Sequence, residues 1–175
     1  EHTTYPATFS VIVNNANING SKDNIGGFVG IIEFVEFEMT FSSVINNANI
    51  KVSYYLGGSI GNRNNRQATL VISNFTNNII AIGDDSYVGG CIGYANSGTI
   101  TFNVSDCLNN PVVSGNSEGI GGFLGGAYST RVTFMVSNSI NNPNATGKKS
   151  VGGLVGGILQ SRSVTVNISN FTNNG

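Results

Sequence analysis

Few side chains in this sequence could carry acid–base or metal chemistry, and their spacing brings few of them together. His2 is the one histidine among 175 residues and lies near the start of the chain, so a Ser-His-Asp triad or a histidine-ligated metal is not expected. A glycosidase needs two carboxylates that flank one bond. The pattern forces no two of the acids together except two outward-pointing glutamates, so we predict that the protein is not an enzyme. The acids are Glu1, Asp23, Glu33, Glu36, Glu38, Asp84, Asp85, Asp106 and Glu118.

Two pairs of these acids are close in sequence. Glu36 and Glu38 alternate with apolar residues, which predicts that both point outward from a strand. Asp84 and Asp85 lie in a stretch of variable sequence and could ligate calcium. The glycine- and aspartate-rich nine-residue repeats of calcium-binding β-helices are absent, however. We accordingly expect no metal and no cofactor.

The composition argues against two classes of partner. Charged residues make up 10% of the chain and the net charge is −1, so no basic surface is available for nucleic acid. No apolar run approaches the roughly 18 residues of a membrane-spanning helix, so no transmembrane segment is expected. The sequence begins at Glu1 rather than Met and stops in mid-repeat at Gly175, which we interpret as a segment of a longer array.

The secondary-structure elements that position these side chains can be predicted from an internal sequence repeat. Between successive Asn-Asn pairs stands an apolar residue followed by Gly-Gly-x-x-Gly, at Ile25–Gly30, Leu56–Gly61, Val88–Gly93, Ile120–Gly125 and Val151–Gly156. A period of this length indicates an array or solenoid, here a single domain with repeats at about 1–30, 31–61, 62–93, 94–125, 126–156 and 157–175. The Asn pairs recur at steps of 32, 31, 32, 32 and 32 residues, at Asn14-Asn15, Asn46-Asn47, Asn77-Asn78, Asn109-Asn110, Asn141-Asn142 and Asn173-Asn174.

A segment with β-strand periodicity precedes each Asn pair. Positions five, seven and nine residues before the pair are apolar, as at Val104, Phe102 and Ile100, whereas the intervening positions hold mostly Thr and Ser. Strands that recur at a fixed period can stack in parallel, which predicts an all-β parallel β-helix (β-solenoid) of about five and a half coils of 31–32 residues. Two coils of about 16 residues per repeat, or a β-propeller, are less favoured alternatives.

Equal repeat positions form columns of touching side chains in such a solenoid. We expect the twelve residues of the Asn pairs to form two structural ladders, because Asn amides bond from coil to coil and Asn tolerates the positive φ of a tight bend. Cys91 and Cys107 fill apolar slots, either as two free thiols or as a disulfide. One slot of the glycine motif is a candidate assembly surface if it faces outward, and ordinary core packing if it faces inward. This slot holds Phe28, Ser59, Cys91, Phe123 and Leu154.

The glycine motif resembles a known family. Ile25 to Gly30, Ile120 to Gly125 and Val151 to Gly156 are similar to the GLUG-type repeat of large bacterial and protist surface proteins, which include adhesins and some secreted peptidases. The resemblance covers the glycine segment in all five copies, although the period here is longer than that family's. It implies a surface or extracellular repeat region. Any peptidase activity in such proteins would reside in a separate domain.

These observations predict a non-catalytic structural or adhesive repeat protein, extracellular or at the cell surface, that forms a filament or a long stalk. Its expected partners are copies of itself, end-to-end or lateral, and glycans or other cell-surface ligands. The alternatives are a polysaccharide-binding module, a carbohydrate-active β-helix enzyme and, from the Thr and Ser columns, an ice-binding protein. Among six N-x-S/T sequons, the one at Asn144 lies in a proline-containing turn and is the best placed for glycosylation.

Overall fold

A computed structural model describes residues 5–20, 24–33, 37–52, 55–58, 60–84, 87–116 and 118–174. Within these ranges the regular elements are β-strands and their pairings are parallel. Equal positions of successive repeats pair with each other, 31 or 32 residues apart, as Phe9 does with Phe41 and Phe41 with Ile72. The predicted parallel β-helix with one coil per repeat is therefore confirmed.

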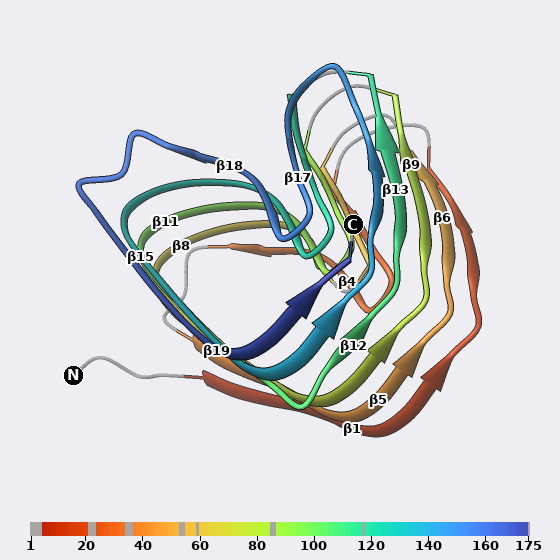
Figure 1. Cartoon of the computed structure of the whole chain (residues 1–175), viewed down its shortest axis with the longest axis horizontal. Coiled ribbons are helices and arrows are strands. Elements are labelled where there is room, and N and C mark those ends of the chain that lie inside the picture. The colour runs from red at the N-terminus through yellow and green to blue at the C-terminus, as the bar shows by residue number, and fades with distance from the viewer. Residues whose placement is uncertain are drawn as a thin grey trace.

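Three parallel sheets run along the solenoid (Figure 1). The nine-stranded sheet contains β1 (Tyr5–Asn14), β4 (Val29–Glu33), β5 (Phe37–Asn46), β8 (Ile60–Asn77), β11 (Ile92–Ser105), β12 (Leu108–Asn109), β15 (Leu124–Asn141), β18 (Val155–Leu159) and β19 (Ser163–Asn173). One five-stranded sheet contains β2 (Asn17–Asn19), β6 (Asn49–Val52), β9 (Ile80–Gly83), β13 (Val112–Gly115) and β16 (Asn144–Thr146). The other contains β3 (Ile25–Gly26), β7 (Leu56–Gly57), β10 (Val88–Gly89), β14 (Glu118–Gly121) and β17 (Lys149–Gly152).

Each coil has two lobes with an indentation between them (Figure 1). The long strands form one wall, bend at a corner and lead into the sheet of β2, β6, β9, β13 and β16. The glycine motif then turns the chain toward the long-strand wall and back again, which divides the interior. The two lobes hold separate apolar clusters, a larger one that includes Phe41, Phe102 and Phe134 and a smaller one that includes Leu56 and Ile120.

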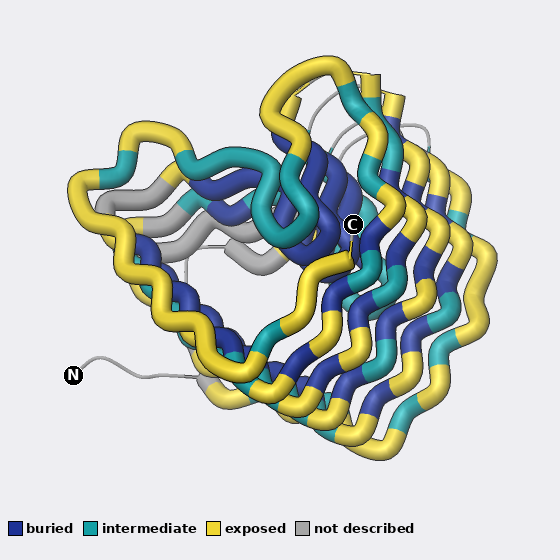
Figure 2. Tube along the Cα trace, in the orientation of Figure 1, coloured by how far each residue is buried: buried dark blue, intermediate teal, exposed yellow. Residues whose placement is uncertain are grey.

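Buried and exposed positions alternate along the long strands, as β-strand geometry requires (Figure 2). In β11 the side chains of Ile100, Phe102 and Val104 are buried, whereas Thr101 and Asn103 between them remain partly exposed. Burial of these inward side chains removes large apolar surfaces from water, which stabilises the fold by about 25 cal/mol per Å² of buried apolar surface. The inward side chains are therefore the main source of stability in the long-strand wall.

The corner of each coil is a residue in the left-handed backbone region. It stands three residues before the Asn pair, and its φ is 52° at Val11, 53° at Ser43, 48° at Asn74, 54° at Asp106, 47° at Asn138 and 46° at Asn170. The corner places two successive side chains outside, so the alternation shifts by one residue and the first Asn of the pair faces inward. Asn and Asp adopt this conformation readily, whereas a β-branched residue does so only under strain.

Val11 is the strained member of the corner column, so we expect Val11→Asn to stabilise the protein. Relief of the left-handed strain should contribute about 1 kcal/mol, which corresponds to a rise in Tm of roughly 2–4 °C for a chain of this size. Val11 is 86% exposed, so no core packing is lost. Thermal unfolding checks this, with Val13→Asn, at a neighbouring exposed position without positive φ, as the control. An unchanged or lower Tm for the Val11 variant contradicts the strain argument.

Candidate functional site

The Asn pair and the glycine motif, which lie on opposite walls of the coil, meet in the interior. The first Asn of each pair points inward, and its Nδ2 donates a hydrogen bond to the carbonyl oxygen of the second glycine. We term these five bonds the waist, because they join the two walls between the lobes. The donor–acceptor distances are 2.9 Å for Asn14 to Gly27, 2.7 Å for Asn46 to Gly58, 2.7 Å for Asn77 to Gly90, 2.8 Å for Asn109 to Gly122 and 2.6 Å for Asn141 to Gly153.

The waist tolerates a change in the length of the chain between its two ends. The bonded residues are 13 positions apart in three coils and 12 apart in the other two. The extra residue is therefore accommodated in the smaller lobe, between the Asn pair and the glycine motif. A turn at the surface can absorb this difference without loss of the buried bond. The last coil accommodates one further residue outside the smaller lobe, because Tyr128 pairs with Leu159 and Arg131 pairs with Ser163.

Both predicted Asn ladders are present, and they run in opposite directions. In the buried ladder the amides of Asn14, Asn77, Asn109 and Asn141 donate to the next coil, as Asn109 Nδ2 does to Asn141 Oδ1 at 2.6 Å. In the outer ladder each amide donates to the preceding coil, as Asn142 Nδ2 does to Asn110 Oδ1 at 2.8 Å. The buried ladder is interrupted at Asn77, whose Oδ1 is buried and has no hydrogen-bond partner.

The reason that we gave for Asn at these positions was partly wrong. None of the twelve pair residues, all of which lie in the described part of the chain, has a positive φ. The bend is made three residues earlier, by the corner column. Asn is required at the first pair position because its side chain has the reach and the donor for the glycine carbonyl, together with an acceptor for its neighbour in the ladder.

Glycine is required in the motif because backbone atoms occupy the space of a side chain. A Cβ on Gly121 would overlap the carbonyl oxygen of Leu124, and a Cβ on Gly122 would overlap that of Gly153 in the next coil. A Cβ on Gly125 would lie 2.5 Å from the carbonyl oxygen of Gly93. The first glycine thus permits the tight turn, and the other two permit close stacking of coils.

The slot of Phe28, Ser59, Cys91, Phe123 and Leu154 belongs to the core, so the candidate assembly surface is not there. Cys91 and Phe123 are 0% and 3% exposed, and Phe28 and Leu154 pack against the same cluster. Ser59 lies outside the described residues. The reason is that the glycine motif is not one continuous strand: the chain turns within it, so the alternation that would have directed this slot outward does not apply.

The two cysteines are buried, and neither forms a disulfide. Cys107 Sγ lies 3.0 Å from the carbonyl oxygen of Ser105, and its backbone N–H donates to Ser139 Oγ at 3.2 Å. Burial raises the pKa of Cys107 to about 11. The thiol is therefore protonated at neutral pH and a poor nucleophile.

The ionisable side chains do not assemble into a metal-binding group within the described residues. No three of His, Cys, Asp and Glu lie close enough there to hold a metal ion. Glu118 forms an ion pair with Lys149 of the next coil at 3.1 Å. Asp106 is an exposed corner residue, and Asp84 is exposed on a bend. Glu36 and Asp85 lie outside the described residues.

Three tyrosines form an aromatic cluster beside the glycine motif, which the repeat pattern did not reveal because they occupy two different columns. The ring centroids of Tyr87 and Tyr94 are 4.5 Å apart, and those of Tyr55 and Tyr87 are 5.9 Å apart. Burial raises the pKa of Tyr94 to about 12. Burial and the nearby Glu118 carboxylate raise the pKa of Tyr87. The Tyr87 ring also covers glycines of the next coil, so this cluster serves packing.

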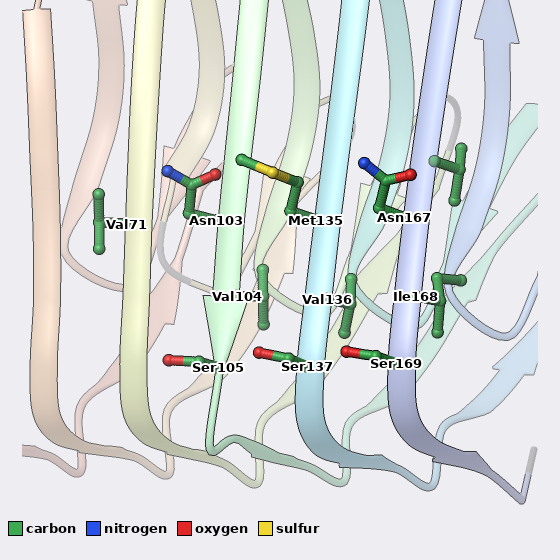
Figure 3. A pocket seen from close by; sticks show the side chains of 11 residues that line it. Val71, Asn103, Val104, Ser105, Met135, Val136, Ser137, Asn167, Ile168 and Ser169 are labelled. Atoms are coloured by element: carbon green, nitrogen blue, oxygen red, sulfur yellow. The ribbon is translucent and has the colours of Figure 1, made fainter.

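The outer face of the long-strand wall carries a shallow groove that runs along the solenoid axis (Figure 3). It encloses about 510 Å³, and we term it the axial groove. One wall is the column of Val71, Asn103, Met135 and Asn167, and the other is the serine column that includes Ser105, Ser137 and Ser169. A neighbouring column holds Thr69, Thr101, Thr133 and Thr165 in register.

The glycosylation candidate Asn144 is exposed at the start of β16, where its backbone N–H donates to the carbonyl oxygen of Pro111 at 2.9 Å. This position allows access to the side chain. In contrast, the Oδ1 atom of Asn103, another sequon residue, is buried and has no hydrogen-bond partner.

We expect Asn109→Ala to destabilise the fold much more than Asn110→Ala does. The first change removes the waist bond to Gly122 and both ladder bonds of a buried amide, and it leaves buried groups unpaired, at a cost of about 3–5 kcal/mol. The second removes bonds of a more exposed amide, at a cost of about 1 kcal/mol or less. Urea unfolding measures both. Equal losses of free energy in the two variants would refute the assignment of the waist as the dominant polar interaction.

We expect the free energy of unfolding to fall as the pH rises from about 9 toward 11, because the unfolded Cys107 thiol ionises before the folded one. The stabilisation from the raised pKa is complete below pH 9 and is lost as the pH passes through the folded value. Urea unfolding across this range measures it. Cys107→Ser is the matched control, since Ser139 already occupies the same column. The same decline in the serine variant would show that another group causes it.

No family model, no curated protein and no solved structure matches this chain. The described residues include no helix that is long and apolar enough to span a membrane.

Proposed function

We propose that the protein is a non-catalytic structural and adhesive module, extracellular or at the cell surface, which extends as a filament or a long stalk. One observation carries this proposal: the inward apolar side chains, the Asn columns and the glycines, which recur from coil to coil, serve the stacking of coils. The inward apolar column forms the core, the Asn columns bond along the axis, and the glycines permit close approach. The likeness of the glycine motif to GLUG-type surface repeats supports the location.

The exposure of the inward side chains on β19 supports extension of the solenoid. Its inward residues Val164, Val166 and Ile168 are 48%, 51% and 48% exposed, whereas their column neighbours in β15 are at most 2% exposed. A further coil stacked on β19 would bury these side chains and satisfy its free backbone groups. Such a coil could come from the same chain or from another copy, and the filament form of the proposal invokes the second.

Electron microscopy of the 175-residue chain tests the proposal. We expect rods with an axial repeat of about 4.8 Å that lengthen with protein concentration and shorten on dilution. Discrete particles, each the size of a single chain at every protein concentration, would contradict the filament form.

Two variants on β19 separate end-to-end growth from other association. Val166→Lys places a charge in the inward column, where stacking would bury it, so we expect no elongation. Thr165→Lys places the same charge on the outward side of the next residue and should leave elongation intact. Rods formed equally by both variants would indicate lateral association.

A further inference from the structure

We propose that the axial groove binds a neutral linear glycan whose chain lies along the solenoid axis. This inference rests on the adhesive part of the proposed function, for which it names the class of ligand.

The groove is on the face of a sheet, which limits what can bind there. Backbone N–H and C=O groups of β11 and β15 are already paired with the neighbouring strands. A peptide that binds by adding a strand needs a free sheet edge, and the face offers none. The ligand must therefore be recognised by the outward side chains.

The side chains that line the groove carry no charge. They supply hydroxyls from the serine column and amides from Asn103 and Asn167. Apolar surface comes from Val71, Met135, Val104, Val136, Val166 and Ile168. Polyanions such as nucleic acids or acidic polysaccharides need cationic partners, and none lines this groove. Hydroxyls and amides alternating with apolar patches match a sugar chain, which has hydroxyl edges and C–H faces.

The spacing of these groups suits a chain that repeats along the axis. The serines are in register on successive strands, so one hydroxyl recurs per coil at about 4.8 Å. The opposite wall alternates apolar and amide side chains, so an amide recurs at every second coil, or about 9.6 Å. A ligand with a regular repeat can therefore make the same contacts several times.

Asn103 supplies a hydrogen-bond acceptor with no partner within the protein. Its Oδ1 is buried and unpaired, because its column neighbours Val71 and Met135 have no donor to offer. Figure 3 shows this oxygen on the side of Met135. The Met135 side chain is flexible and 39% exposed, so its displacement would let a ligand hydroxyl reach the oxygen.

The test uses the 175-residue chain produced without N-glycosylation, because Asn103 and Asn167 are themselves sequon residues. Soluble linear glucan, mannan and xylan are the probes, and alginate is the anionic control. Binding is measured by affinity electrophoresis and by the rise in Tm. We expect saturable binding of at least one neutral chain and none of alginate. Binding of alginate alone, or of no glycan, overturns the proposal.

The double variant Asn103→Val/Asn167→Val tests directly whether the glycan binds in the axial groove. Valine already occupies this column at Val71, so the fold should be retained, and Tm measured without glycan verifies this. We expect affinity to fall at least about tenfold, as the loss of two hydrogen bonds implies. Asn116→Val, on the exposed bend between β13 and β14, is the matched control and should bind as the unmodified chain does. Undiminished binding by the double variant overturns the groove assignment. Rods that form without any glycan binding would leave the structural proposal standing and remove this one.

Discussion

The hydrogen bond between an inward Asn and a glycine carbonyl holds the two walls of each coil together. Without it, the glycine motif would present carbonyl oxygens to the interior with no donor, and a buried unpaired carbonyl is costly. The Asn side chain supplies that donor and at the same time bonds to the equivalent Asn of the next coil. One residue thus fixes both the cross-section of a coil and the register between coils. Asn77 keeps its waist bond to the carbonyl oxygen of Gly90, although its Oδ1 accepts no ladder bond.

The glycines of the motif are also needed for the hydrogen bond between the inward Asn and the glycine carbonyl. The motif can approach the Asn wall only if its turn is tight, and neighbouring coils can stack at the spacing of a parallel sheet only if the motif carries no side chains at the points of contact. Chain-length variation is then displaced to turns away from the waist, as in the smaller lobe, where the bonded residues are 12 or 13 positions apart. The fold therefore combines a rigid waist with a tolerant turn.

The sequence was sufficient to predict the architecture. Alternation with a period of two residues follows from the geometry of a strand, and a period of 31–32 residues follows from the stacking of equal coils. The Asn ladders followed from the same argument. The contact between Asn109 and Gly122 could not be inferred, because nothing in the spacing of two motifs says that they face each other across a coil. The corner at Asp106 was missed for a related reason: a single left-handed residue shifts the alternation without interrupting the polar pattern. Cys91 and Phe123 were open to two interpretations because a turn within the glycine motif cancels the alternation there.

The division between inward and outward columns also decides where function can reside. Inward positions are committed to packing or to the waist, so a change there is felt as a loss of stability. Outward positions of the long strands are constrained mainly to be compatible with a strand. The serine column is the same from coil to coil, whereas the column of Val71, Asn103 and Met135 varies. Such variation costs little in stability and alters the chemistry of a surface that the core holds rigid. Any discrimination among ligands by this solenoid therefore depends on outward columns, which is why the axial groove, rather than the more regular Asn ladders, is where we place binding.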